Sequence, residues 1–328
     1  MNVRLVRRPA FVLATDAPPP LRGYWTRSWT RLLQNRLAVM GLVIVAILVV
    51  MAVFAPLVAP HDPAQQDLYN TFAGPSFEHP AGTDNLGRDW FSRIVYGARV
   101  SLIVGLAAQV LVLTVGLPVG LVAGLKGRFV DSALMRFTDL AYAFPDLLLI
   151  ILLRSALGGG LLQLVLIIGF VSWMDTARLV RGQVLTLRER EFVTAARSLG
   201  ATDAQIMFRH LLPNLTGPVI VMLALGIPRA VFIEAALSFI GLGVRIGTPS
   251  WGAMVQEGYG AILAFPHLVL APSIAIALLL LAFTFIGDGL RDALDPTTDT
   301  AKSKPLPQAE KPRGLRQTSG EDERQRAA

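Results

Sequence analysis

Charged residues are scarce in this sequence, and cysteine is absent. Only 16% of the 328 residues are charged and 53% are hydrophobic, whereas an ordinary soluble domain has roughly 25% charged residues. Without cysteine there is no disulfide, no thiolate metal ligand and no cysteine nucleophile. The histidines are few and do not show the spacing of a zinc site. We therefore predict no metal site and expect structural or interfacial roles for His61, His79, His210 and His267.

A phosphate-binding loop is missing as well. The pattern G-x-x-x-x-G-K-[ST], whose backbone cradles the phosphates of ATP, does not occur, and the glycine cluster at 158–160 lacks a following lysine. A chain that depended on ATP would therefore need a partner to hydrolyse it. We predict neither catalytic nor cofactor-binding residues, and we expect that the chain is not an enzyme.

Long apolar blocks dominate what is present, with a mean hydropathy of +0.54. The block 37–58 has no charge, and at about 1.5 Å per residue it crosses a hydrocarbon core of about 30 Å. It is longer than the roughly 7 to 15 apolar residues of a signal peptide. We read it as a membrane anchor. Further spans are expected at 101–125, 137–153, 159–174, 215–240 and within 263–286, which makes an all-α polytopic membrane protein with six transmembrane helices.

Two of these spans contain unusual residues. Gly116, Gly120 and Gly124 fall four apart on one helix face. They permit close approach of another helix or reflect only the frequency of glycine in membrane helices, and the sequence leaves both readings open. In the span 137–153, Pro145 is expected to kink the helix.

Lysine and arginine predict the orientation. They gather in 1–36, 126–136 and 178–209, which share one side of a six-span model and should be cytoplasmic, together with both termini. The net charge of +7 is best explained by anionic lipid headgroups, and no nucleic-acid partner is expected. The expected organisation is a cytoplasmic segment 1–36, a first transmembrane helix 37–58, an extracytoplasmic loop and entry to the core 59–100, a five-helix core 101–290 with a cytoplasmic loop 188–214, and a disordered cytoplasmic tail 297–328.

The cytoplasmic stretch EFVTAARSLGATDAQIMFRHLLPN, 191–214, predicts two short helices. The first ends or turns at Gly200. Thr202 and Gln205 have the spacing of a capping box, so a second helix should begin near Asp203 and stop at Pro213. Its apolar residues form either a docking element or a connector that folds back on the bundle. A DNA-binding helix-turn-helix is disfavoured because both ends are tethered to membrane spans.

This stretch resembles the EAA motif of ABC importer permeases, which reads Glu-Ala-Ala, three residues, Gly, nine residues, Ile, one residue, Leu-Pro. Thr194 replaces the acidic residue and His210 replaces the isoleucine. The stretches 82–102, 234–258 and 286–296 resemble the dipeptide and oligopeptide (and nickel) permease branch, specifically the subunit with an extended N-terminal segment. By this resemblance the coupling loop comprises Ala195, Ala196, Gly200, Ala201, Asp203, Ile206, Met207, Arg209, His210, Leu212 and Pro213.

The resemblance implies the type I ABC importer permease fold, in a bacterial inner membrane. It implies pairing with a second homologous permease, with two cytoplasmic ATPases and with an external substrate-binding protein. Relatives carry peptides, nickel or opines, and no cluster of side chains distinguishes these cargoes. A secondary transporter with paired carboxylates in two repeated halves and, less favoured, a membrane-embedded enzyme are the alternatives.

Ionisable residues within the spans are candidates for the translocation path, because charge inside a membrane is unfavourable and is usually functional. The alternative is that a span is shorter or shifted, so that the charge lies at a water interface. The residues concerned are Asp139, Asp146, Arg229 and Glu234.

Overall fold

The computed structural model describes residues 21–245 and 247–295, and every regular element in these ranges is a helix. The helices are α1 (Leu21–Gln34), α2 (Arg36–Val53), α3 (Ala55–Val58), α4 (Trp90–Lys126), α5 (Arg128–Tyr142), α6 (Asp146–Leu157), α7 (Leu161–Leu187), α8 (Glu191–Ser198), α9 (Asp203–Gln205), the π-helix η1 (Ile206–Leu211), α10 (Leu212–Phe239), α11 (Trp251–Tyr259) and α12 (His267–Leu294). The predicted tail 297–328 and the first 20 residues lie outside the described residues.

The six-helix prediction is confirmed as five continuous helices and one broken one. The continuous helices are α2, α4, α7, the run from α9 through η1 to α10, and α12; each is long and apolar enough to cross a membrane. The helices α5 and α6 together could form a sixth span, bent by 76° at their junction. Pro145 stands at this junction, directly before α6. It has no backbone N–H and disfavours helical geometry in the preceding residue, so the predicted kink is confirmed.

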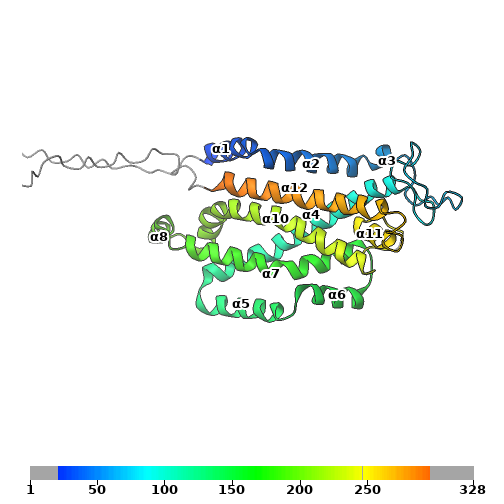
Figure 1. Cartoon of the computed structure of the whole chain (residues 1–328). Coiled ribbons are helices and arrows are strands. Elements are labelled where there is room, and N and C mark those ends of the chain that lie inside the picture. The colour runs from blue at the N-terminus through cyan, green and yellow to red at the C-terminus, as the bar shows by residue number, and fades with distance from the viewer. Residues whose placement is uncertain (1–20, 246, 296–328) are drawn as a thin grey trace, which may run out of the picture. The chain divides into compact units, whose positions relative to one another are not determined.

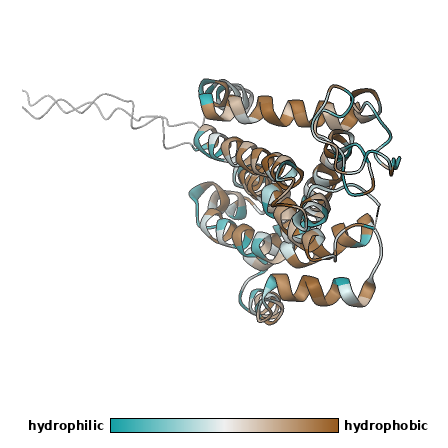
Figure 2. Cartoon of the chain, turned by 45° about the vertical axis from the view of Figure 1, so that its right-hand side comes forward, coloured by the Kyte–Doolittle hydropathy of each residue, from teal (hydrophilic) through white to brown (hydrophobic). Residues whose placement is uncertain are grey.

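The spanning helices run side by side (Figure 1), and hydrophobic residues dominate along them while hydrophilic residues gather at their ends (Figure 2). Because the chain reverses direction at each turn, α8 lies at one end of the bundle, with the start of α2 and the ends of α4 and α7. The opposite end carries α3, α11 and the loop 59–89. We call these the α8 end and the α11 end.

The three glycines of α4 lie in its contact with α7. A Cβ at Gly116 would lie 2.7 Å from the Trp173 carbonyl oxygen, and one at Gly120 would lie 2.6 Å from that of Ala177. At Gly124 the added atom would lie 2.6 Å from Val184 Cβ. These separations are far shorter than a normal carbon contact of about 3.5 Å or more. The close-packing interpretation is therefore confirmed.

The second span is longer than predicted. Instead of beginning near residue 101, α4 begins at Trp90. Its first turns contain Ser92 and Arg93, which lower the local hydropathy but are both fully buried. Burial of these polar groups depends on partners from other segments, which hydropathy along one helix does not reveal.

Candidate functional site

The loop between α7 and α10, at the α8 end, has the two-helix form that the sequence predicts. The first helix, α8, is followed by Gly200 with φ +84°, a left-handed conformation that glycine adopts without strain. The capping box is confirmed. The Gln205 amide donates to Thr202 Oγ1 at 3.3 Å, and the Thr202 amide donates to Gln205 Oε1 at 2.8 Å. The second helix begins at Asp203, as predicted.

The predicted helix end at Pro213 is wrong. The run from Asp203 to Phe239 is one continuous helix, with the π-helical segment η1 directly before the proline. In this segment the Leu212 amide donates to the Met207 carbonyl, five residues earlier. The π-helical turn lies directly before Pro213 and accommodates its missing N–H and its ring. The helix therefore continues from the loop into α10 without a break.

The apolar residues of this loop divide into a buried and an exposed set. Ile206 and Leu211 are fully buried and pack in a cluster with Val184 and Val193 of the preceding helices. For these residues the interpretation that they fold back on the bundle holds. The other predicted residues of the coupling loop are partly or largely accessible. The half-buried ones include Met207, Ala201, Leu212 and His210, and the exposed ones are Ala195, Gly200, Asp203, Arg209 and Pro213.

A second, exposed apolar set was missed by the sequence analysis. Leu199 is 89% exposed, Phe208 is 63% exposed and Phe192 is 41% exposed. Which residues of a short helix point outward depends on how the helix rests on the bundle, and spacing within the segment does not determine that. We call Phe192, Leu199 and Phe208 the apolar docking set.

Charged residues of four helices meet on one exposed face of the bundle. Arg229 of α10 donates to Asp146 of α6 at 2.5 Å and also to Asp175 of α7, which accepts a further hydrogen bond from Tyr142 of α5. Close by, Arg178 lies over the Tyr142 ring, with its guanidinium carbon 4.1 Å from the centroid. We call this group, with the Arg178–Asp139 pair at 2.6 Å, the polar face.

Pairing between helices explains how charge is accommodated in these spans. Arg229 remains 47% exposed despite its two carboxylate partners. Sequence reasoning identified Asp139, Asp146 and Arg229, but it missed Asp175, which is the carboxylate that Arg229 and Tyr142 share. Spacing within one helix cannot show a contact made from a neighbouring helix.

The structure does not bring Glu234 to the polar face. Its side chain is fully buried, and it accepts a hydrogen bond from Ser238 Oγ at 2.7 Å. Ser238 in turn lies 3.3 Å from Ser250 Oγ, so the surroundings are the packed contact between α10 and the start of α11. Glu234 and Arg229 thus occupy separate environments on α10.

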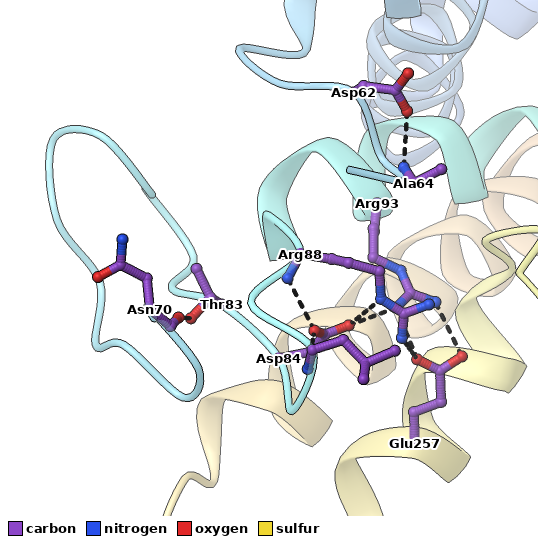
Figure 3. Close-up of polar contacts among 9 residues, drawn as sticks. Asp62, Ala64, Asn70, Thr83, Asp84, Arg88, Arg93 and Glu257 are labelled. Atoms are coloured by element: carbon purple, nitrogen blue, oxygen red, sulfur yellow. Dashed lines mark hydrogen bonds and ion pairs between the residues drawn. The ribbon is translucent and has the colours of Figure 1, made fainter. Parts of the chain in front are cut away.

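An ion-pair network holds the α11 end together (Figure 3). Asp84 Oδ2 accepts from Arg88 Nε and from Arg93 Nη1, both at 2.6 Å. Glu257 of α11 accepts from the same two arginines, at 2.7 Å and 2.9 Å. Since Asp84 and Arg88 belong to the loop before α4, the network joins that loop to α4 and α11.

The fold defines the class of protein. The structure is similar to that of the MetNI methionine ABC transporter in inward-facing conformations, with a TM-score of 0.52 and 19% sequence identity over 62% of this chain and 96% of that chain. A second crystal form of the same transporter gives a TM-score of 0.52 at 20% identity. The class is therefore the type I ABC importer permease fold.

The particular family follows from the sequence. Residues 116–300 match the family described as binding-protein-dependent transport system inner membrane component, and residues 23–75 match the N-terminal TM domain of oligopeptide transport permease C. The chain belongs to the family of binding-protein-dependent transport permeases.

Relatives from several bacteria align over most of their length. The chain is 40% identical to the oligopeptide transport system permease protein OppC of Bacillus subtilis, over 83% of this chain and 89% of the relative. It is 42% identical to the dipeptide transport system permease protein DppC of Alkalihalophilus pseudofirmus, over 88% and 97%. It is 39% identical to the glutathione transport system permease protein GsiD of Pectobacterium atrosepticum, over 84% and 92%.

Family membership makes this chain a multi-pass inner-membrane permease subunit and not an enzyme. Neither alternative, the secondary transporter or the membrane-embedded enzyme, has support from these relatives.

Proposed function

We propose that this chain forms, with a second homologous permease, the membrane pathway through which an ABC importer moves di- or oligopeptides into the cell. Two cytoplasmic ATPases would drive the transport, and an external binding protein would deliver the peptide. The observation that carries the proposal is the identity of about 40% to oligopeptide and dipeptide permeases over more than 80% of the chain. Nickel and other small solutes are the second candidate class of cargo.

The α8 end is the cytoplasmic end in this proposal, which also places both termini in the cytoplasm. Lysine and arginine favour the cytoplasmic side, and it is their number that matters. The basic residues at the α8 end include Arg36, Lys126, Arg128, Arg188, Arg190, Arg197 and Arg209. Those at the α11 end are fewer in the described residues, namely Arg88, Arg93, Arg99, Arg154 and Arg245.

The loop 188–214 is the proposed contact with the ATPase. Its apolar docking set, Phe192, Leu199 and Phe208, is exposed at the α8 end, whereas Val193, Ile206 and Leu211 of the same loop are buried in a cluster with residues of α7 and α10. Exposed aromatic and aliphatic side chains on a rigid support are suitable anchors for a groove in a partner protein.

The polar face is the proposed lining of the translocation path. It carries both signs of charge, with Arg229 beside Asp146 and Asp175. A peptide in water carries an ammonium group and a carboxylate group, so a lining that offers partners for both would lower the cost of its desolvation. The helices that contribute this face are α5, α6, α7 and α10, and its exposure in the single chain is consistent with a position facing the second permease.

The decisive experiment uses the complete transporter in proteoliposomes, with the external binding protein and labelled di- and tripeptides. Leu199→Asp places a charge in the apolar docking set, and Gln183→Asp places the same charge at an exposed position of α7 at the same end. If Leu199 is an anchor worth about 2 kcal/mol, its loss weakens ATPase binding roughly 30-fold. We expect Leu199→Asp to lose copurifying ATPases and peptide uptake, and Gln183→Asp to retain both.

Two results would contradict the proposal. Full retention of the ATPases by Leu199→Asp would exclude the loop as the coupling contact. Uptake of Ni²⁺ but of no peptide by the wild-type transporter would replace peptides as the cargo and leave the permease assignment intact.

A further inference from the structure

Two histidines that are far apart in the sequence meet at the α11 end. His61 follows α3, and His79 lies near the end of the loop that leads to α4, next to Glu78. One ring nitrogen of each histidine and one carboxylate oxygen of Glu78 all lie within 4.8 Å of one another. The two rings are tilted by 34°, with their centroids 4.8 Å apart. Spacing along the chain did not predict this cluster, because the long loop brings the two segments together.

His79 is held in the manner of a metal-binding histidine. Its Nδ1 lies 2.9 Å from Asp89 Oδ1, and because an ionised carboxylate only accepts hydrogen bonds, Nδ1 carries the proton. This leaves Nε2 as the ring nitrogen with a lone pair. Asp89 is itself fixed, since its side chain is fully buried and its other oxygen accepts the Ser92 amide at 2.7 Å at the start of α4. A carboxylate that orients an imidazole in this way is the usual outer partner of a metal-bound histidine.

His61 is anchored to the same turn of α4. Its backbone amide donates to Ser92 Oγ at 3.1 Å. Its Nδ1 is buried and has no hydrogen-bond partner among the described residues. The ring also borders an open hollow of about 430 Å³ that Pro60, Asp62 and Tyr96 help to line. The imidazole is therefore held beside His79, next to a space through which a solute can reach it.

We propose that His61, His79 and Glu78 bind one divalent transition-metal ion of the Zn²⁺ and Ni²⁺ type. Two imidazoles and a carboxylate form a ligand set that binds Zn²⁺ or Ni²⁺ in preference to Ca²⁺ or Mg²⁺. The latter two ions require mainly oxygen ligands. Ligand atoms around tetrahedral zinc lie about 3.3 Å apart, from bond lengths of about 2.0 to 2.1 Å. Glu78 is exposed, so rotation of its side chain can close the remaining gap.

The bound ion would clip the segment after α3 to the segment before α4. Three protein ligands leave at least one coordination position for water or for a donor from outside the chain. The site lies at the α11 end, opposite the end that carries the loop 188–214. The proposal goes beyond the proposed function and holds whichever solute the permease carries.

The test measures metal binding by the purified full-length chain in detergent, carrying an affinity tag without histidine. Co²⁺ serves as the spectroscopic probe and Zn²⁺ as the competitor. We expect about one Co²⁺ per chain, with visible ligand-field absorption that Zn²⁺ abolishes. The double variant H61A/H79A should lose stoichiometric binding, and Glu78→Gln should weaken it at least roughly tenfold, because a ligand is lost. His210→Ala removes a histidine from the other end of the bundle and should bind as the wild type does.

Folding is checked separately by thermal unfolding in EDTA. Equal unfolding temperatures for wild type and variants in EDTA, with a rise on adding Zn²⁺ in the wild type and in His210→Ala but not in H61A/H79A, support a local site. The proposal is overturned if the wild type binds no Co²⁺ or Zn²⁺ at micromolar concentrations, or if H61A/H79A binds as many ions with equal affinity.

Discussion

Replacing Gly120 by alanine tests the contact between α4 and α7. The added Cβ would lie 2.6 Å from the Ala177 carbonyl oxygen and 2.7 Å from Val180 Cβ. Because the first of these atoms is backbone, the two helices must separate by nearly an ångström, and overpacking of this kind costs about 1–3 kcal/mol. Alanine also favours a helix over glycine by about 1 kcal/mol, so the steric cost and the helix preference must be separated.

Gly182→Ala separates them. This glycine is in α7, and a Cβ there would meet no atom within 4 Å. It therefore gains the helix preference without the clash. The difference in unfolding free energy between the two variants should be about 1–3 kcal/mol, or roughly 5- to 150-fold in the folded-to-unfolded ratio. Reversible unfolding in mixed micelles of increasing SDS content measures this difference. Equal stability of Gly120→Ala and Gly182→Ala would show that the glycine face does not set the distance between the helices.

Two further predictions concern buried and exposed charges. Arg229→Gln should lower peptide uptake in proteoliposomes roughly tenfold or more without changing assembly. Glu234→Gln, whose site is the packed contact between α10 and α11, should retain uptake within about twofold. Equal losses of uptake would show that Arg229 does not line the path. Arg93→Met should destabilise the chain by about 3–5 kcal/mol in the same SDS titration. The variant removes a buried positive charge that pairs with the carboxylates of Asp84 and Glu257. Glu257→Gln, whose side chain is 26% exposed, should cost less, and a larger loss for Glu257→Gln would contradict this ranking.

The apolar spans were predictable because each must satisfy its own backbone hydrogen bonds and present apolar side chains to lipid. The glycine spacing at 116, 120 and 124 was informative for a similar reason, since residues four apart share a helix face. Pro145 acts through its own covalent structure, so its kink could also be predicted. The N-terminal helix α1 was not predicted, because Leu21–Gln34 is too polar to be recognised as a span.

Contacts between distant segments could not be predicted from one sequence. Arg93 was placed in the extracytoplasmic segment 59–100, but Asp84 and Glu257 allow it to be buried inside α4. Asp175 had no predicted role until Arg229 of another helix was placed beside it. His61 and His79 likewise meet only because a loop closes between them. In each case the missing information was the three-dimensional position of a partner residue.

The error at Pro213 bears directly on how the proposed transporter would work. A helix that stopped there would leave the loop flexible, so that a movement imposed on it by an ATPase would be dissipated before it reached the membrane. The helix instead continues without a break from Asp203 to Phe239. Leu211, at the base of the loop, and Arg229, on the polar face, are therefore separated by about 27 Å of continuous helix at 1.5 Å per residue. In the proposed mechanism, closure of the ATPases displaces the loop, and the continuous helix carries that displacement to Arg229 and its partners Asp146 and Asp175, past Pro218 and Pro228 inside α10. The ion pairs that α10 makes with α6 and α7 are then the contacts that must break and form again as the path opens and closes.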